Sequence, residues 1–542
     1  MPSHDARARK IGDGRGNAGS VPLLLLLLLK RAAFAGVALL VLAAGLGLVL
    51  QAGSGPKAEA ASEQARNGEA PVRQKMKLGI NLFGPATYNR QQVFTNLISQ
   101  SEWFSSHGGG WAVFPADQLD ERGWIVSLKP GQTAPRPLIL PPAPYRPTVV
   151  RCRYAGKGRI EAGGVASVRE RGDQSLLLDL TPTGEEGQAA WIELTRTDAA
   201  DPVRAIDCRE MTRPERERFH PDFLSFVKQF AFIRFLDWQR TNDNAAARWA
   251  ERTRPDSSSQ VGPMGVSIED MIDLANRTGA DPWFLMPYRA DQDYIRAFAQ
   301  LVHRRLDPGR TVYVELGNEI WNDMFDAAQQ ARREGLAMKL GEGDPGRAQM
   351  IRYAQKIQVA MRIWTQVFAD RPDRLVRVAA SQNANPALAD IILGHGDTAA
   401  WVDALATAPY IWIDLDGYGS GESDRVFAHM PRAIDDALAF AERNRMVARR
   451  YGKRFITYEG GQHLVTKDMA LARAIQRDPR MGVVYDSYLN RWNAQMGGEL
   501  ALYASTTPIS EYGSWGLLEY GGQPPAEAPK MLAVQQFLKR LH

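Results

Sequence analysis

The sequence predicts a (β/α)₈ barrel, and three observations support this fold class. Eight short apolar runs occur between Lys77 and Ser505, a turn follows each run, and helical patterns lie between most of them. Strands that are apolar along their whole length are typical of a parallel sheet covered by helices. An open, doubly wound sheet would give the same alternation, but the count of eight favours a closed TIM barrel.

The predicted strands and helices alternate along the chain. The strands comprise residues 77–84, 231–239, 281–288, 312–319, 375–381, 404–412, 454–461 and 499–505. Apolar residues recur with a helical period in residues 268–277, 294–305, 321–338, 348–369, 433–451 and 485–496. We therefore expect the barrel domain to comprise residues 76–147 and 199–542.

Residues 148–198 interrupt this alternation between the first and second strands. Short β-type runs are separated there by glycine-rich turns without helical periodicity, which predicts a small antiparallel β insertion. Cys152 and Cys208, the two cysteines of the chain, lie near its ends. They could form a disulfide in an oxidising compartment or remain free buried thiols, and their spacing does not decide between these states.

The first 50 residues predict a membrane anchor. Residues 1–31 are basic, whereas residues 32–50 contain no charged side chain. A helix of this length would reach roughly 28 Å, close to the hydrocarbon thickness of a bilayer. The basic flank predicts a cytoplasmic N-terminal tail, so that everything after Gln51 would be exported.

Other interpretations of this apolar segment are a cleaved signal peptide and a buried core helix. A signal peptide usually has an apolar core of about 7 to 15 residues, so the longer segment favours an uncleaved anchor. Residues 51–75 are small, polar and aperiodic, which predicts a flexible linker. We expect a single-pass protein of the inner membrane, with its globular part in the periplasm or outside the cell.

Composition and missing motifs exclude several classes of function. The net charge is +5, but acidic and basic residues are interspersed without a long basic stripe, so we expect no nucleic acid partner. His-Glu-x-x-His, Cys-x-x-Cys, phosphate-loop and Gly-x-Ser-x-Gly motifs do not occur. The sequence therefore predicts neither a metal site nor another cofactor, and no serine nucleophile.

Two predicted strands end in glutamates, Glu319 and Glu459. The segment VYVELGNEIWND (312–323) passes from Gly-Asn-Glu into a predicted helix that begins near Trp321, and in RFITYEGGQH (454–463) two glycines follow Glu459. Both carboxylates are expected at the C-terminal ends of strands four and seven, the face on which such barrels place active sites. Two carboxyl groups about 5 to 5.5 Å apart can cleave a glycosidic bond with retention of configuration.

The motifs LGNEIWN and TYEGG resemble those of glycoside hydrolase clan A, and the resemblance covers residues 77–84 and 220–520. In that clan, strand four ends in an Asn-Glu pair and strand seven in a second glutamate. The resemblance implies that Glu319 is the acid/base, that Asn318 contacts the sugar 2-hydroxyl, and that Glu459 is the nucleophile. The hydroxyl contact is of the kind that strengthens in the transition state.

The same resemblance implies further substrate-site residues. Arg234 would keep the nucleophile ionised, or else form a structural ion pair with Asp237 or another acid. Tyr410 matches a tyrosine that approaches the nucleophile, although Ala408 stands where the clan usually has histidine. Trp515 matches an aromatic floor for a sugar ring, or is a packing residue. Weaker candidates are Trp321, Trp238, Trp412 and His463.

Together these observations predict a retaining glycoside hydrolase that acts on a β-linked polysaccharide or oligosaccharide outside the cytoplasmic membrane. Two alternatives remain, a non-catalytic carbohydrate-binding protein on a barrel scaffold and a transglycosylase. Ala408 is the residue that favours the first alternative. In either case, residues 148–198 are predicted to form an accessory carbohydrate-binding lobe or a structural decoration.

Overall fold

The computed structural model describes residues 75–140, 146–185 and 187–541. Eight parallel strands form a closed barrel in which each strand pairs with the next along the chain and the last pairs with the first. They are β1 (Lys77–Asn81), β11 (Phe232–Arg234), β12 (Asp281–Met286), β13 (Val312–Leu316), β14 (Leu375–Ala380), β15 (Ala404–Thr407), β17 (Arg454–Thr457) and β19 (Glu499–Leu502). Each strand lies within one of the eight predicted runs, so the predicted barrel is confirmed.

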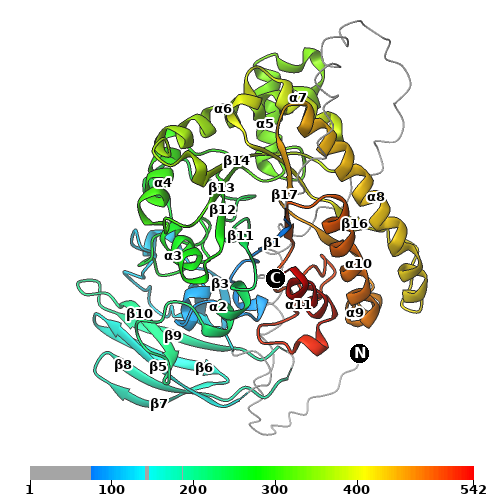
Figure 1. Cartoon of the computed structure of the whole chain (residues 1–542). Helices are drawn as coiled ribbons and strands as arrows, with labels where there is room; N and C mark the ends of the chain where they lie inside the picture. Colours follow the sequence, from blue (N-terminus) through cyan, green and yellow to red (C-terminus); the bar gives the residue numbers. More distant parts are fainter. Residues whose placement is uncertain (1–74, 141–145, 186, 542) are drawn as a thin grey trace, which may run out of the picture.

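Helices surround the barrel (Figure 1). They are α2 (Pro221–Val227), α3 (Ile268–Thr278), α4 (Gln292–Arg305), α5 (Asp326–Ala337), α6 (Pro345–Val367), α7 (Pro386–Gly394), α8 (Ser423–Arg450), α9 (Met469–Arg477), α10 (Pro479–Gln495) and α11 (Pro529–Leu541). Helix α8 begins earlier than the predicted residue 433, because it continues through Pro431, a residue that usually ends a helix. Strand and helix side chains such as Phe284 and Trp364 share one large core.

A second group of side chains fills the barrel interior. Trp283 and Tyr313 stack there with ring centroids 5.4 Å apart, and the Phe232 ring lies beside them. Gly79 in β1 makes room for that ring, because a Cβ atom at this position would lie 2.3 Å from it. The interior is therefore packed with side chains below the C-terminal rim, and the polar residues described below lie above this packing.

A β-sandwich is inserted between β1 and β11, and we call it the lobe. One sheet contains β4 (Ala134–Leu138), β9 (Ala190–Thr197) and β6 (Gly158–Gly164). The other contains β10 (Arg204–Glu210), β5 (Thr148–Ala155), β8 (Ser175–Leu180) and β7 (Ala166–Gly172). The two sheets enclose a separate hydrophobic core, and the lobe projects from one side of the barrel (Figure 1).

The lobe is larger than the predicted residues 148–198, because β4 and β10 lie outside them. The sequence concealed both strands. Two prolines in β4 cannot donate to a β-ladder, which argues against a strand, and β10 is mostly polar. A short hairpin of β2 (Phe104–His107) and β3 (Gly110–Val113) precedes the lobe in the chain.

Cys152 in β5 and Cys208 in β10 are directly opposed across the two strands and form a disulfide. Both residues are buried in the lobe core. The alternative of two free thiols, which the sequence left open, is therefore not what the structure shows.

The predicted cytoplasmic tail, the membrane anchor at 32–50 and all but the last residue of the linker lie within residues 1–74, outside the described residues. Among residues 75–140, 146–185 and 187–541, no helix has the length and apolar character needed to cross a membrane. The anchor therefore remains a prediction from the sequence.

Candidate active site

Arg234, at the end of β11, is fully buried in a polar network at the C-terminal rim of the barrel. Its Nε and Nη2 groups each donate to the Glu315 carboxylate at 3.1 Å. Nη1 donates to Glu459 at 2.8 Å and to Asn81 at 3.1 Å, and Nη2 also donates to Asn318 at 2.8 Å. All five guanidinium N–H groups are thus used. Glu459 is among the partners, whereas Asp237, the alternative ion-pair partner considered from the sequence, is not.

Glu459 lies just beyond the end of β17 and has both carboxylate oxygens engaged. Oε1 accepts from Arg234, and Oε2 accepts from the Tyr410 hydroxyl at 2.9 Å. Burial raises the pKa of Glu459, whereas the Arg234 charge and the hydrogen bonds from Tyr410 and Arg234 lower it. Burial outweighs these contacts, so the pKa of Glu459 is raised overall. The Arg234 cation and the Tyr410 hydroxyl oppose this rise and fix the orientation of the carboxylate.

Glu319 follows β13 in a tight turn, with a φ of +43° that is unusual for a residue other than glycine. Oε1 accepts from the Tyr458 hydroxyl at 3.0 Å, and Oε2 accepts from Asn322 Nδ2 at 3.0 Å. Both donors are neutral. Burial and the nearby charge of Glu459 raise the pKa of Glu319 to about 7, so this carboxyl group retains a proton near neutral pH.

The helix expected from Trp321 onward begins only at Asp326, and the residues between Glu319 and that helix form turns. The Asn322 side chain stabilises this turn, because its oxygen accepts from the Met324 amide at 3.2 Å while its nitrogen donates to Glu319. A helix starting at Trp321 would not allow this arrangement. Trp321 itself is partly buried against the barrel core.

Tyr410 lies beyond the sixth barrel strand instead of ending it. β15 stops at Thr407, and Tyr410 opens β16 (Tyr410–Trp412), which pairs in parallel with β18 (Gly461–His463) above the barrel. Because β18 follows Glu459 directly, this small sheet brings Tyr410 to the carboxylate. Tyr410 reaches Glu459 although Ala408 replaces the histidine of the resembling clan.

His463 lies next to both Tyr410 and Trp515. The His463 ring is 5.2 Å from the Tyr410 ring and 5.7 Å from that of Trp515, whose Nε1 donates to His463 Nδ1 at 3.4 Å. Burial lowers the pKa of His463 to about 4, so its ring is neutral near pH 7. The structure thus gathers His463 and Trp515 beside Glu459, through Tyr410.

The weaker tryptophan candidates lie in different settings. Trp238 is fully buried and donates to the Phe83 carbonyl at 3.2 Å, and it also lines the cavity described below. Trp412, at the end of β16, is 41% exposed.

Several site residues were missed in the sequence. Glu315 is a charged residue within the apolar run VYVEL, and this contrast was the one available signal. Asn81 ends β1 and donates to the carbonyls of Tyr458 and Leu502, which ties three strands together at the rim. Tyr458 directly precedes Glu459 and donates to Glu319, so adjacent residues serve both carboxylates.

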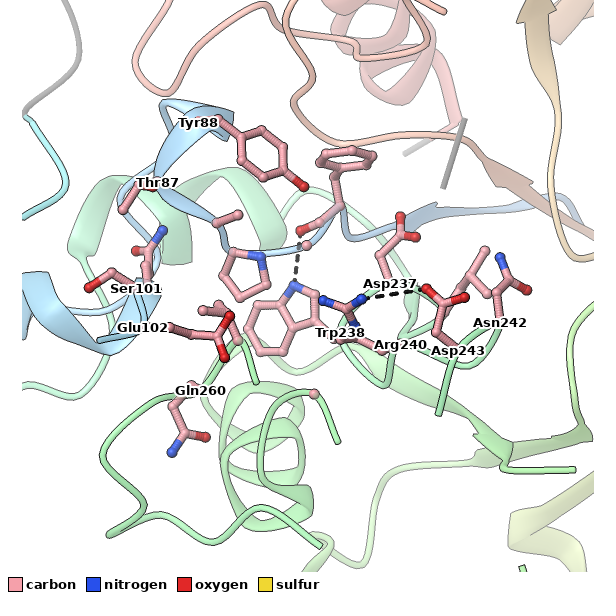
Figure 2. A pocket seen from close by; sticks show the side chains of 18 of the residues that line it. Thr87, Tyr88, Ser101, Glu102, Asp237, Trp238, Arg240, Asn242, Asp243 and Gln260 are labelled. Carbon is pink, nitrogen blue, oxygen red and sulfur yellow. Dashed lines mark hydrogen bonds and ion pairs between the residues drawn. The ribbon is translucent and has the colours of Figure 1, made fainter. Parts of the chain in front are cut away.

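A cavity lies next to this network, and Figure 2 shows residues that line it. Glu319 and Glu459 are not among the lining residues. The space between the lining atoms is about 1050 Å³, including the part open to solvent. Asp237 lines it and accepts from the Tyr503 hydroxyl at 3.1 Å, while burial and the charge of Glu459 raise the pKa of Asp237 to about 7. Asn242 also lines it and accepts from Asn318 at 3.0 Å, so the cavity adjoins the carboxylate network.

Comparison with known proteins gives no match to a family model or to a curated protein. Solved structures give weak matches that include glycoside hydrolases. An α-L-arabinofuranosidase from Thermotoga maritima is 13% identical with a TM-score of 0.35, over 58% of this chain and 64% of that enzyme. A GH5 cellulase affiliated with Bacteroidetes is 9% identical with a TM-score of 0.34, over 59% and 86%.

An endo-β-1,4-mannanase from Cellulomonas fimi, of glycoside hydrolase family 26, is 13% identical with a TM-score of 0.32, over 57% of this chain and 63% of the enzyme. The chain thus spans less than two thirds of the arabinofuranosidase and of the mannanase. The barrel implied by the resemblance to clan A is confirmed by the closed eight-stranded sheet itself.

Proposed function

We propose that this protein is a retaining glycoside hydrolase in which Glu459 is the nucleophile and Glu319 the acid/base. One observation carries the proposal: two buried carboxyl groups at one rim have environments that separate their protonation states. Arg234 and Tyr410 favour ionised Glu459, whereas Glu319 receives neutral donors and faces a negative charge. Such a separation assigns the acid and the nucleophile in glycosidases.

In the first step, Glu319 donates its proton to the glycosidic oxygen while a Glu459 oxygen attacks the anomeric carbon. The bond to the leaving sugar breaks, and a covalent glycosyl ester forms on Glu459. Arg234 and Tyr410 hold the attacking carboxylate in place. The absence of a histidine at Ala408 is thus compensated, which supports catalysis over simple binding.

In the second step, Glu319 is ionised and takes a proton from a water molecule, which attacks the anomeric carbon and releases Glu459. A sugar hydroxyl in place of water would give transglycosylation by the same route. Asn318 lies next to Glu319 and uses its oxygen for Arg234 and one N–H for Asn242. We propose that its second N–H donates to the sugar 2-hydroxyl.

The proposed substrate is a β-linked polysaccharide or oligosaccharide, cleaved outside the cytoplasmic membrane by a protein anchored through residues 32–50. Two observations support this location. The apolar segment with its basic flank predicts export, and the Cys152–Cys208 disulfide is of a kind that persists in oxidising compartments.

The test is hydrolysis by the soluble protein from residue 75 onward against a panel of β-linked polysaccharides, with Glu459→Ala as the control. We expect release of reducing ends by the wild type only, and proton NMR of the first product should show the same anomeric configuration as the substrate. Inversion would exclude Glu459 as the nucleophile. Equal turnover by wild type and Glu459→Ala would reject the whole assignment.

A further inference from the structure

Two half-buried tryptophans meet at the junction of the hairpin and the lobe. Trp111 of β3 and Trp191 of β9 have ring centroids 5.2 Å apart and planes inclined by 86°. Phe104 of β2 lies 5.6 Å from Trp111. We call these three side chains the aromatic corner.

The lobe core does not require Trp191. Along β9, Ala190, Ile192 and Leu194 are buried in the lobe core, so Trp191 between them points to the outer face of the sheet. Its register partner on β6 is Gly163, where a Cβ atom would lie 2.4 Å from the indole. The missing side chain thus lets a large apolar ring lie close against the outer face of the sheet.

The aromatic corner is continuous with the cavity next to the carboxylate network. Phe104 lines that cavity and contacts Trp111. Pro137 of β4 also lines it and is paired directly with Trp191, so both residues lie on one face of the sheet. Asp237 and Asn242 line the same cavity, and Figure 2 shows both side chains.

We infer that the aromatic corner binds additional sugar units of a polysaccharide that extends from Glu319 and Glu459 through the cavity onto the lobe. The C–H faces of pyranose rings pack against aromatic rings, and two perpendicular indoles offer a ring a floor and a wall. This inference rests on the proposed function. It gives the lobe a role in selecting long chains over short oligosaccharides.

The test compares Trp111→Ala and Trp191→Ala with the wild type on oligosaccharides of increasing length and on the polymer. We expect kcat/KM for the polymer to fall about tenfold in each variant, with less than a twofold change on the shortest cleaved oligosaccharide. Trp401→Ala is the matched control. Trp401 precedes β15 at the opposite end of the barrel, is also half-buried and contacts Arg362.

Thermal unfolding identifies a variant that loses activity by misfolding, and Trp111→Phe and Trp191→Phe, which keep an aromatic face, should recover most of the activity on the polymer. Equal losses on short and long substrates, or no loss on the polymer, would overturn the inference.

A binding measurement separates this inference from the proposed function. Glu459→Ala should be retarded in gels that contain the polysaccharide, and adding Trp111→Ala should abolish the retardation. Retardation that persists without Trp111 and without Trp191 would reject the aromatic corner and leave the glycosidase assignment intact. Retardation that depends on these tryptophans, in a protein without hydrolytic activity, would reject the glycosidase and retain the corner.

Discussion

The two ends of the barrel both bury carboxylates but balance their charges differently. At the C-terminal end, Glu319 contacts only neutral donors. At the N-terminal end, Glu499 of β19 accepts from the Tyr313 hydroxyl at 3.0 Å and from Arg454 at 3.2 Å. The N-terminal carboxylate thus has a cation in direct contact, whereas the acid at the other end has none.

Asp281, at the start of β12, repeats the N-terminal arrangement. Lys77 and Arg310 lie 3.9 and 3.8 Å from its carboxylate, and the Thr311 amide donates to it at 3.0 Å. Burial raises the pKa of Asp281, and these groups oppose the rise.

Under the proposed function, this difference reflects different tasks of the two ends. A buried acid without a cation destabilises the fold once it ionises, and the backbone of Glu319 also has an unfavourable φ. Such features persist where chemistry requires them. The N-terminal end, where both Glu499 and Asp281 lie near cations, should instead contribute stability, as is usual for this fold.

The strongest test of this contrast is Glu319→Gln. Removing the general acid should lower kcat/KM by about 10³-fold for substrates with a sugar leaving group. Aryl glycosides with acidic phenols need little protonation and should lose far less in the bond-breaking step. Steady-state kinetics on both substrate types measures the difference, and an equal loss on both would show that Glu319 is not the acid.

The pH profile sharpens the same test. The acid must be protonated, and its pKa is about 7, so kcat/KM of the wild type should fall as the pH rises through about 7. This alkaline limb should disappear in Glu319→Gln, because glutamine does not titrate. A limb that stays in the variant would assign the titration to another group, such as Asp237.

Arg234→Lys should produce the next largest effect. Lysine has three donors and no planar fork, so it cannot replace the five hydrogen bonds to four residues. We expect about a 10²-fold loss in kcat/KM and a free energy of unfolding lower by about 3 kcal/mol. Urea unfolding and kinetics measure the two effects. Full activity in Arg234→Lys would show that a positive charge alone, without the five hydrogen bonds, is enough to keep the carboxylate network active.

Tyr410→Phe should have a smaller effect. It removes one hydrogen bond to an ionised carboxylate, which is worth about 1.5 kcal/mol and corresponds to about a tenfold loss of kcat/KM. Because the hydroxyl lowers the pKa of Glu459, the acidic limb of the profile should move to higher pH in the variant. An unchanged acidic limb would separate Tyr410 from the nucleophile.

Glu499→Gln should leave activity within about twofold of the wild type, the smallest catalytic effect of the series. Replacing a carboxylate that contacts Tyr313 and Arg454 should lower the free energy of unfolding by about 2 kcal/mol. Chemical denaturation and kinetics on the same preparation measure both. A large loss of activity with normal stability would break the contrast between the two ends.

The sequence was most informative about features that depend on a local pattern of residues. Buried parallel strands are apolar along their length, so all eight were predicted, and Glu319 and Glu459 stood out as acids at strand ends. Glu315, in contrast, is a single charged residue inside an apolar strand, and the sequence does not show which partners it has.

Contacts between distant segments were not predictable in this way. Asp237 and Tyr503 belong to loops after the second and last barrel strands, and only closure of the barrel brings them together. The sequence predicts a helix at Asn322 where the structure has a turn. The side-chain hydrogen bonds that stabilise this turn leave no pattern in the sequence.

The separate core of the lobe has a consequence for how the chain folds. Strand β1 pairs with β11, from which it is separated by roughly 150 residues. This pairing requires closure of a loop of that length, which is entropically unfavourable. The lobe has its own core, and its antiparallel pairs join segments that are closer together in the chain than β1 and β11 are, so these pairs close shorter loops. If the lobe folds first, it shortens the open loop to about half its length and lowers the closure free energy by about 0.6 kcal/mol. The insertion would thus help to assemble the barrel that it interrupts.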